Sequence, residues 1–333
     1  MRDEGPLRLG VLGAARITPM ALLAPARRVG EATIVAVAAR DPERARRFAR
    51  RHDVPRVCES YEALLADPEV DAIYNPLPNS LHAQWTMRAL AAGKHVLCEK
   101  PFASNAAEAE DMAAAARRSG LVLMEAFHYR YHALFERTRA IVRAGELGRV
   151  TRLQAHFCIP LLRSGDIRYR ADLAGGALMD TGCYAVHWLR HTAEAEPTVE
   201  RAAARWTRGG VDRWLEAYLS FPGGRGARLT CALASAIPLR IGAGIDGDAG
   251  RLRILNFVLP HFHHRLTVTT RAGRRRERVA GEPTYDAQLR AFVAAVRHGA
   301  AFPTTPADAV ANMRVIDAIY AAARSGTPPF SRA

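Results

Sequence analysis

Lysine is nearly absent from this chain of 333 residues. Lysine and arginine together number 47, and only Lys94 and Lys100 are lysine, which leaves 47 − 2 = 45 arginines. Alanine is also abundant, so the bias points to pressure on the coding sequence, with arginine serving wherever any cation suffices. Two lysines six positions apart then indicate a role that a guanidinium cannot fill, because an ammonium is a compact charge whose pKa moves readily on burial. Chance survival of both lysines is the alternative.

Other absences narrow the class of protein. No apolar run approaches the roughly 18 residues that span a bilayer, and the first residues, Met1–Pro6, lack the apolar core of a signal peptide. The five cysteines are scattered, with no Cys-x-x-Cys pair, at positions 58, 98, 158, 183 and 231. This usage fits a reducing compartment better than a disulfide framework. We therefore expect a cytoplasmic protein with no membrane partner.

Basic charge is plentiful, with a formal net charge of +14, but its distribution argues against nucleic acid. The arginines are spread along the chain, and no basic stretch alternates with aromatic residues. The densest groups, 46–51 and 274–276, are expected on a solvated helix face and at a hairpin tip. Anionic small ligands fit this charge better than nucleic acid does.

Histidine pairs invite a metal interpretation, because a spacing of four residues can place two zinc ligands on one helix face. The candidates are His128 and His132, His187 and His191, and the group His261, His263 and His264. No nearby cysteine or glutamate completes any of these sets. We expect no metal site.

The stretch around Lys100 predicts a ligand-binding strand end. His95–Cys98 is a short apolar run followed at once by Glu99, Lys100 and Pro101. It is typical of a buried parallel strand with charge only at its carboxyl end, which is where open α/β sheets bind ligands. Pro101 also disfavours a helical conformation for Lys100. A lysine fixed there is well placed to act on a ligand.

The start of the chain predicts a dinucleotide site. Leu7–Leu12 is expected to be a strand, and Gly13, Ala14, Ala15, Arg16 and Ile17 turn the chain toward a helix. Such a turn brings the backbone close to a pyrophosphate at a helix N-terminus. The glycine motif is degraded here to Gly13-x-Ala15-x-x-Thr18 and is weak by itself. An ordinary strand–helix turn is the alternative.

The end of the second strand, expected at 33–39, favours NADP(H) over NAD(H). An NAD site usually has an acidic residue at this strand tip, whereas Ala39 and Arg40 stand here, and an arginine can bind a 2′-phosphate. Asp41 is expected to cap the helix 42–51 rather than to bind ribose. The alternative is that Arg40 is an ordinary surface arginine.

The predicted order of strands and helices differs between the two parts of the chain. Strands and helices alternate as far as Glu125, with a last strand at 121–124, which is typical of a doubly wound sheet. From Val150, short strands follow one another with turn residues between them. We expect them at 150–158, 198–206, 214–221, 227–235 and 251–258, with helices at about 177–191, 284–298 and 305–324. The predicted fold is α/β: a Rossmann domain, 1–125, followed by an α+β domain with a mostly antiparallel sheet, 126–333.

The helix expected at 177–191 carries a second group of candidate functional residues. Asp180 and Tyr184 are four residues apart and share one helix face, and His187 continues the stripe. A phenol beside a lysine is a plausible acid–base pair, because the cation eases loss of the phenol proton. A cap at Asp180 and a core role for Tyr184 are the alternatives, and for His187 we favour packing or a hydrogen bond.

These motifs resemble the Gfo/Idh/MocA family of oxidoreductases over nearly the whole chain. The carriers are Gly13-x-Ala15, Asn79-x-x-His82, Gly93–Pro101 and Gly176–Tyr184. The resemblance implies NADP(H) contacts from Pro76, Asn79, His82, Glu99 and Lys100, in addition to the turn residues and Arg40. It also implies a cis Lys100–Pro101 bond and an open sheet used for substrate binding and oligomerisation, so we expect a homodimer or homotetramer.

The same resemblance implies a mechanism. Tyr184 gives or takes the proton of a carbinol or ketone, Lys100 lowers the pKa of Tyr184 and polarises the oxygen, and Asp180 orients the group. Arg130, Arg168 and His187 are further candidates for substrate contacts. The expected reaction is hydride transfer between NADP(H) and a sugar or related polyol.

Three alternatives remain open. Tyr184 resembles the branch with dimeric dihydrodiol dehydrogenases, glucose-fructose oxidoreductases and deoxysugar 3-ketoreductases. Gly165–Tyr169 resembles the last of these, which favours a nucleotide-linked 3-keto-deoxysugar as substrate. Val35–Asp41 and Leu123–Ala126 resemble dihydrodiol and xylose dehydrogenases, and an aromatic trans-dihydrodiol is the second alternative substrate. A non-catalytic dinucleotide-binding regulator is the third, although such a protein is expected to lack the lysine that this chain retains.

Overall fold

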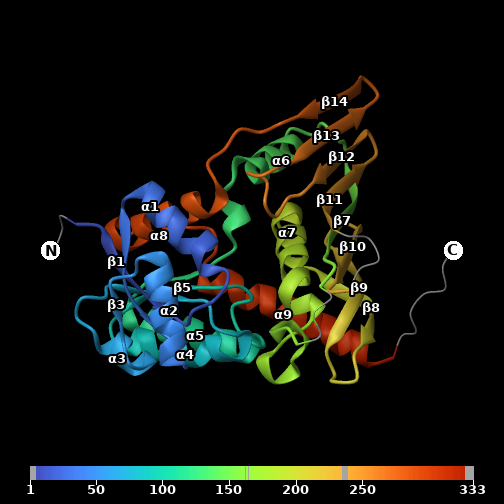
Figure 1. The fold of residues 1–333 in the computed structure, drawn as a ribbon. Helices are drawn as coiled ribbons and strands as arrows, with labels where there is room; N and C mark the ends of the chain where they lie inside the picture. The colour runs from blue at the N-terminus through green and yellow to red at the C-terminus, as the bar shows by residue number, and fades with distance from the viewer. Residues whose placement is uncertain (1–4, 162, 164, 235–238, 327–333) are drawn as a thin grey trace. The chain divides into compact units, whose positions relative to one another are not determined.

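The protein divides into two compact units that do not follow a single cut in the sequence. Unit 1 comprises Met1–Arg130 and Tyr285–Val310, and unit 2 comprises Tyr131–Thr284 and Ala311–Ala333 (Figure 1). The computed structural model describes residues 5–161, 163, 165–234 and 239–326.

Unit 1 thus includes residues 285–310, which the sequence analysis placed in the second domain. Long-range polar contacts hold this segment to the rest of the unit. The Arg28 guanidinium pairs with Asp286 at 2.6 Å, and the Glu125 amide donates to the Thr304 carbonyl at 3.1 Å. Neither contact leaves a local signal in the sequence, because the partners are more than 170 positions apart.

Unit 1 is built on a six-stranded parallel sheet of order β3-β2-β1-β4-β5-β6. This is the doubly wound order in which ligands bind at the carboxyl edge, so the predicted α/β fold is confirmed. The strands are β1 (Leu7–Leu12), β2 (Ala32–Ala38), β3 (Arg56–Val57), β4 (Ala72–Asn75), β5 (His95–Cys98) and β6 (Leu123–Glu125). The two-residue strand β3 was not predicted.

The helices of unit 1 begin and end at identifiable residues. The Asp41 carboxylate accepts hydrogen bonds from the amides of Glu43 and Arg44 at the start of α2, so the predicted Asp41 cap is confirmed. The Asn105 side chain caps α5 by accepting from the Glu108 amide. The helices are η1 (Pro19–Leu23), α1 (Ala24–Val29), α2 (Pro42–His52), α3 (Tyr61–Ala66), η2 (Asn79–Leu81), α4 (His82–Ala91), α5 (Ala106–Ser119), η3 (His128–Tyr131) and α8 (Thr284–His298). The division between the units falls within α9 (Pro306–Arg324).

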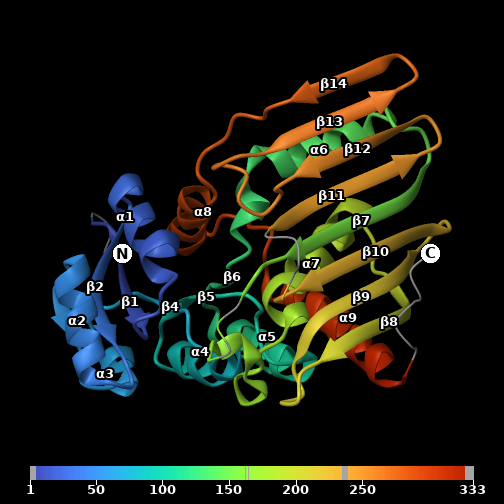
Figure 2. The same ribbon diagram turned by 45° about the vertical axis from the view of Figure 1, so that its right-hand side comes forward.

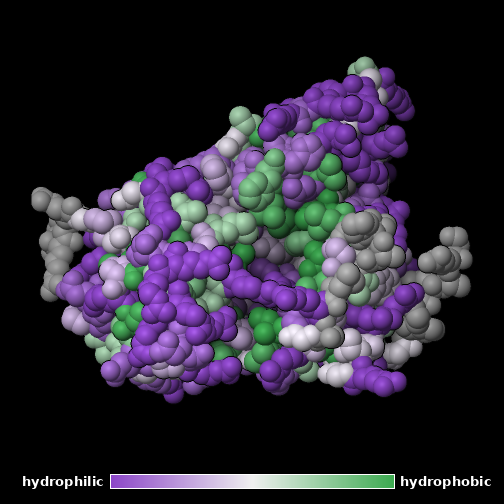
Figure 3. Space-filling model, viewed as in Figure 1, coloured by the Kyte–Doolittle hydropathy of each residue, from purple (hydrophilic) through white to green (hydrophobic). Residues whose placement is uncertain are grey.

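The predicted exposed face of α2 is also present. Ala45, Phe48 and Ala49 are buried, whereas Arg46, Arg47, Arg50 and Arg51 are exposed. Figure 3 shows this part of the surface as hydrophilic. The apolar stripe holds the helix on the sheet, and the arginines face solvent.

Unit 2 contains an eight-stranded sheet of order β14-β13-β12-β11-β7-β10-β9-β8 (Figure 2). Among the described strands of this sheet, only β7 and β10 pair in parallel, which confirms the predicted mostly antiparallel sheet. The strands are β7 (Val150–Cys158), β8 (Thr198–Trp206), β9 (Asp212–Phe221), β10 (Arg225–Ala232), β11 (Arg240–Gly247), β12 (Gly250–Leu255), β13 (Arg265–Thr270) and β14 (Gly273–Glu277). The strand predicted at 227–235 ends at Ala232, and residue 235 lies outside the described residues.

One local prediction was wrong. Residues 274–276 lie within β14 and not at a hairpin tip, because the turn falls at Arg271–Ala272 with Thr270 paired to Gly273. Gly273, the first residue after this turn, adopts a φ of 129°, which glycine tolerates best. Hydrophilic side chains cover this hairpin in Figure 3.

Two helices of unit 2 lie on one face of its sheet, α6 (Ala133–Arg143) and α7 (Cys183–Ala193) (Figure 2). Helix α7 packs on β7 and β10 and is buried almost all round, with Trp188 fully enclosed. Shorter turns precede it: η4 (Ile167–Tyr169), η5 (Ala171–Leu173) and the π-helical η6 (Leu178–Gly182). Among the described residues, no helix combines the length and apolar character that crossing a membrane requires.

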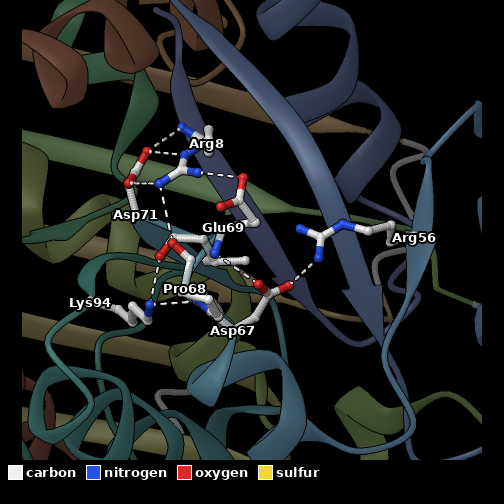
Figure 4. A network of polar contacts seen from close by, with 8 residues as sticks. Arg8, Arg56, Asp67, Pro68, Glu69, Asp71 and Lys94 are labelled. Atoms are coloured by element: carbon white, nitrogen blue, oxygen red, sulfur yellow. Dashed lines mark hydrogen bonds and ion pairs between the residues drawn. The ribbon is translucent and has the colours of Figure 1, made fainter. Parts of the chain in front are cut away.

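Lys94, one of the two lysines, has a structural role (Figure 4). Its ammonium donates to the carbonyls of Asp67 at 2.8 Å and Val70 at 2.7 Å, in the segment between α3 and β4. Burial lowers the pKa of Lys94. The same segment is held by Arg8, which donates to both carboxylate oxygens of Asp71. A compact ammonium therefore supplies the donor for two carbonyls of this segment.

Replacing Lys94 by methionine is expected to destabilise unit 1, because the Val70 carbonyl loses the ammonium as its donor while the apolar stem is kept. The Asp67 carbonyl keeps the donor of the Val70 amide. We expect the free energy of unfolding to fall by about 1–3 kcal/mol, as for a buried polar group left unpaired. Urea unfolding at neutral pH measures it.

The matched control is Arg88→Met, which removes a cation from an exposed pair with Glu62 and should cost less than about 1 kcal/mol. Equal losses of free energy of unfolding in the two variants would show that the carbonyl contacts of Lys94 do not contribute to stability.

Candidate active site

The turn after β1 has the geometry that the sequence predicted for a dinucleotide. Gly13 has a φ of 83°, its amide donates to the Ala38 carbonyl at 2.6 Å, and a Cβ there would lie 3.0 Å from Leu77. Ala14 is buried, Ala15 and Ile17 are partly buried, and Arg16 is exposed. Glycine is required at the turn for its backbone angle, and the small residues that follow keep the backbone accessible.

The tip of β2 gathers positive charge beside this turn. Arg40 is exposed just after the strand, and Arg44, one helical turn on, donates to the Ala14 carbonyl at 2.9 Å. Tyr61 also lies beside this turn, because its hydroxyl is within hydrogen-bonding reach of the Arg40 backbone. Sequence analysis missed Arg44 and Tyr61, because neither belongs to the glycine motif.

The residues at the turn fit a phosphate-bearing cofactor. Thr18, at the start of the helical segment, has a fully buried hydroxyl oxygen with no hydrogen-bond partner among the described residues. A buried polar atom of this kind needs a ligand, water or ion to satisfy it. The glycine turn, the helix start and the two arginines offer the donors and charge that a pyrophosphate and a 2′-phosphate require.

The carboxyl ends of β4 and β5 bring together the second group of predicted residues. The Glu99 carboxylate accepts a hydrogen bond from the Tyr74 hydroxyl at 2.7 Å, and the Glu99 amide donates to the Asn75 carbonyl at 3.0 Å. Lys100 follows, partly exposed. The Lys100–Pro101 peptide bond is cis, as the family resemblance implied.

His82 lies between the loops at these two strand ends, and its neutral ring donates one hydrogen bond to them. Its ring nitrogens lie 2.8 Å from the carbonyl oxygens of Pro101 and Leu77. The ring is completely buried, and that burial, with the charge of Lys100 as a smaller cause, lowers the pKa of His82. Pro76 is buried in the intervening loop and Asn79 begins η2, so all five residues predicted here occupy one edge of the sheet.

Arg130 also belongs to unit 1. It lies in η3 and is only 8 % exposed. Its burial makes it unlike the surface arginines of the chain.

Unit 2 carries Asp180 and Tyr184 on a helix whose first turn differs from the prediction. The sequence indicated one regular helix at about 177–191, whereas residues Leu178–Gly182 form a π-helical turn that continues into α7. Single π-turns occur mostly within longer helices and often at functional sites. Gly182 allows the turn to approach β10, because a Cβ there would lie 2.9 Å from Cys231 Sγ.

Arg168 and Asp180 meet directly. The Arg168 Nε donates to the Asp180 carboxylate at 2.7 Å, and its Nη1 donates to Asp166 at 3.1 Å. The charge of Asp180 is the main cause that raises the pKa of Arg168. Asp166 also caps η4 through the Arg168 amide. Two residues that were predicted separately are thus one ion-paired group.

Tyr184 and His187 are both buried in α7. Tyr184 is 5 % exposed, and its ring packs edge-on against Phe157 at 5.7 Å. His187 is fully buried with its ring 4.3 Å from that of His191, which fits the packing role that the sequence analysis favoured.

Asp212, at the start of β9, was not anticipated. Its Oδ2 accepts a hydrogen bond from the Leu178 amide at 2.8 Å, and its Oδ1 accepts one from the Tyr320 hydroxyl at 2.8 Å. Burial, as the largest cause, raises the pKa of Asp212 to about 6. Its partners are 34 and 108 positions away, so no spacing in the sequence reveals the group.

Comparison with known proteins identifies the family. The GFO/IDH/MocA family model described as "Oxidoreductase family, NAD-binding Rossmann fold" matches residues 7–127. The model described as "GFO/IDH/MocA C-terminal domain" matches residues 135–253. A D-xylose 1-dehydrogenase (NADP(+)) from Haloferax volcanii is 36% identical over 96% of this chain and 98% of its own. A dTDP-3,4-didehydro-2,6-dideoxy-alpha-D-glucose 3-reductase from Streptomyces antibioticus is 39% identical over 96% and 97%.

A solved structure agrees with these relatives. A 3-ketoreductase from Actinomadura kijaniata, in complex with NADP and TDP-benzene, has a TM-score of 0.90 and 32% identity over 96% of this chain and 98% of its own. The chain belongs to the Gfo/Idh/MocA family of oxidoreductases. The resemblance drawn from the motifs is therefore confirmed, and so is the oxidoreductase class.

The raised pKa of Asp212 predicts a specific pH dependence of stability. The folded state holds the Asp212 proton more tightly than the unfolded state, whose pKa is near 3.8. Stability from this group is present below pH 3.8 and is lost as the pH rises through about 6. Asp212→Asn cannot titrate, so its stability relative to the natural chain should rise between pH 4 and 6 by up to about 3 kcal/mol.

Thermal or urea unfolding of both proteins at several pH values measures the difference in their free energy of unfolding. Groups that titrate alike in both proteins do not contribute to that difference. A difference that stays constant across this range would contradict the raised pKa.

Proposed function

We propose that the protein transfers a hydride between NADP(H) and a secondary alcohol or ketone of a sugar or related polyol. The observation that carries this proposal is the arrangement of Lys100. It follows a buried parallel strand, between Glu99, which Tyr74 fixes, and Pro101, which His82 fixes. The same sheet carries the Gly13 turn at its carboxyl edge. A fixed cation beside a nucleotide site suits carbonyl chemistry.

Each residue has a defined role in this proposal. NADP(H), when bound, supplies or accepts the hydride. Gly13–Ile17 hold its pyrophosphate, Arg40 its 2′-phosphate, and Pro76, Asn79, His82 and Glu99 shape the edge near Lys100. Tyr184 gives or takes the substrate proton, and Lys100 eases that transfer and polarises the substrate oxygen. Asp180 orients the reacting group and is itself held by Arg168.

The relatives support NADP and a sugar-like substrate. The Haloferax enzyme is named for xylose and NADP(+), and the Streptomyces enzyme for a nucleotide-linked keto-sugar. The second substrate candidate is therefore a nucleotide-linked 3-keto-deoxysugar. It is favoured by the likeness to a reductase solved with TDP-benzene. Arg130 and Arg168 are candidate substrate contacts, together with His187 as the least exposed of the three.

Oligomeric state and location complete the proposal. A homodimer or homotetramer rests on the family resemblance, and a cytoplasmic location rests on the scattered unpaired cysteines. Sedimentation of the purified protein distinguishes dimer from tetramer.

A substrate panel tests the proposed activity. NADPH oxidation with ketoses and nucleotide-linked keto-sugars, and NADP(+) reduction with aldoses and trans-dihydrodiols, should identify one class with measurable turnover. NADPH binding without turnover on any substrate would instead favour the non-catalytic regulator.

Lys100→Ala is expected to lower turnover by at least about 100-fold, the usual contribution of a positioned acid–base group. The Kd for NADPH should stay within a few-fold of the natural value, because Gly13 and Arg40 are untouched. Steady-state kinetics and a fluorescence titration measure the two quantities.

The matched control is Lys94→Ala, which removes the other lysine of the chain from a purely structural site. Its turnover per folded molecule should be unchanged. Normal turnover in Lys100→Ala would remove Lys100 from the mechanism.

Arg40→Ala is expected to weaken NADPH binding by roughly 10- to 100-fold, which corresponds to one lost charge-assisted contact. NADH has no 2′-phosphate, so its Kd should hardly change. Parallel tryptophan-fluorescence titrations give both constants.

Arg47→Ala, on the exposed face of α2, is the control for general loss of positive charge and should affect neither cofactor strongly. If Arg40→Ala lost affinity equally for NADPH and NADH, another residue would make the 2′-phosphate contact.

A further inference from the structure

The carboxylate of Asp212 joins three segments of unit 2 that are distant in sequence. Asp212 opens β9 and is 1 % exposed. One oxygen accepts from the amide of Leu178, the first residue of η6, and the other accepts from the hydroxyl of Tyr320 on α9. Both acceptor atoms are therefore used, each by a different element.

The chain approaches this carboxylate so closely that only glycine fits. A Cβ on Gly176 would collide with Asp212 Oδ1 and would lie 2.7 Å from the Tyr320 hydroxyl oxygen. Gly176 also has a φ of 139°, a conformation that other residues rarely adopt. The position at which the chain enters the π-helical turn is thus fixed by contact with the Asp212–Tyr320 pair.

The held segment carries the residues proposed to act on substrate. Asp180 lies two positions after Leu178, and Tyr184 lies six positions after it. Arg168 holds the Asp180 side chain, and Gly182 packs against Cys231. A negative group at the start of a helix also complements its dipole. The orientation of the segment therefore depends on Asp212 at its beginning.

Few other groups surround the pair. Cys231 on β10 and the ring of Trp206 on β8 lie near it, with the Trp206 and Tyr320 ring centroids 6.1 Å apart. The guanidinium of Arg324 is 5.5 Å from the Tyr320 ring centroid. The Ala177 amide also acts on the Asp212 carboxylate. Loss of this carboxylate removes the acceptor of the Leu178 amide.

We propose that Asp212 and Tyr320 are positioning residues, which fix the register of segment 176–184 and so orient Asp180 and Tyr184 toward the substrate. This inference rests on the proposed function of Asp180 and Tyr184.

Conservative and disruptive variants separate positioning from charge. Asp212→Asn keeps one oxygen for the Leu178 amide, and its amide group donates to the Tyr320 hydroxyl oxygen, so the geometry is retained. Asp212→Leu has a similar volume but removes both acceptors. Tyr320→Phe removes one contact and is the milder variant if Asp212→Leu does not fold. Asp246→Leu, which breaks an ion pair with Arg253 on β12, is the matched control.

Kinetics give the first readout. Asp212→Leu should lower kcat by roughly 10- to 100-fold per folded molecule, since displacement of reacting groups by about 1 Å costs that much. The Kd for NADPH should not change, and Asp212→Asn and Asp246→Leu should stay within a few-fold of the natural kcat. The kcat of Tyr320→Phe should lie between those of Asp212→Leu and Asp212→Asn.

Hydrogen exchange gives a second readout that needs no substrate. Peptides covering 176–184 should exchange faster in Asp212→Leu, but not in Asp212→Asn or Asp246→Leu. If the natural protein turns over no substrate, the proposed function fails, and the exchange result still decides whether Asp212 holds the segment.

Two results would overturn the inference. Equal kcat in the asparagine and leucine variants would mean that the contacts do not position the reacting groups. Faster exchange in Asp212→Leu with an unchanged kcat would show that the contacts are only structural.

Discussion

The imidazole of His82 is the contact on which the candidate cofactor edge depends. It lies between the carbonyl oxygens of Leu77 and Pro101 and so links the loop after β4 to the loop after β5. Parallel strands place such loops side by side at one edge, but they do not fix the loops to one another. With this link in place, Lys100 has a defined position between Glu99 and Pro101.

Buried polar groups play the same part in unit 2. The Asp212 carboxylate accepts from partners 34 and 108 positions away. Arg168 joins the carboxylate of its near neighbour Asp166 to that of Asp180. Leaving any such group unpaired in the interior costs free energy, so the pairs select one arrangement of the irregular segment before α7. The regular sheet supports this arrangement without specifying it.

The two lysines of the chain illustrate how composition and function meet. Lys94 serves two backbone carbonyls at a closed turn, a site that suits a small ammonium better than a planar guanidinium. Lys100 stands at the ligand-binding edge of the same sheet. In a chain that otherwise uses arginine, both positions call for a compact cation, one for the fold and one for the proposed chemistry. A purely regulatory dinucleotide-binding protein has no such need for Lys100.

The two architectures and the family could be predicted from the sequence, and so could the residues proposed for the site, because local patterns record them. Short apolar runs ending in charge predicted the strand edge at Lys100, and the Gly13 turn and Asp41 cap followed from neighbouring residues. The tertiary structure alone decided which distant groups meet. The return of residues 285–310 to unit 1, the Arg168–Asp180 pair, the Arg44 contact to Ala14 and the Asp212–Tyr320 pair all join residues without a fixed spacing. Such contacts arise from the packing of whole elements, and no local period records them.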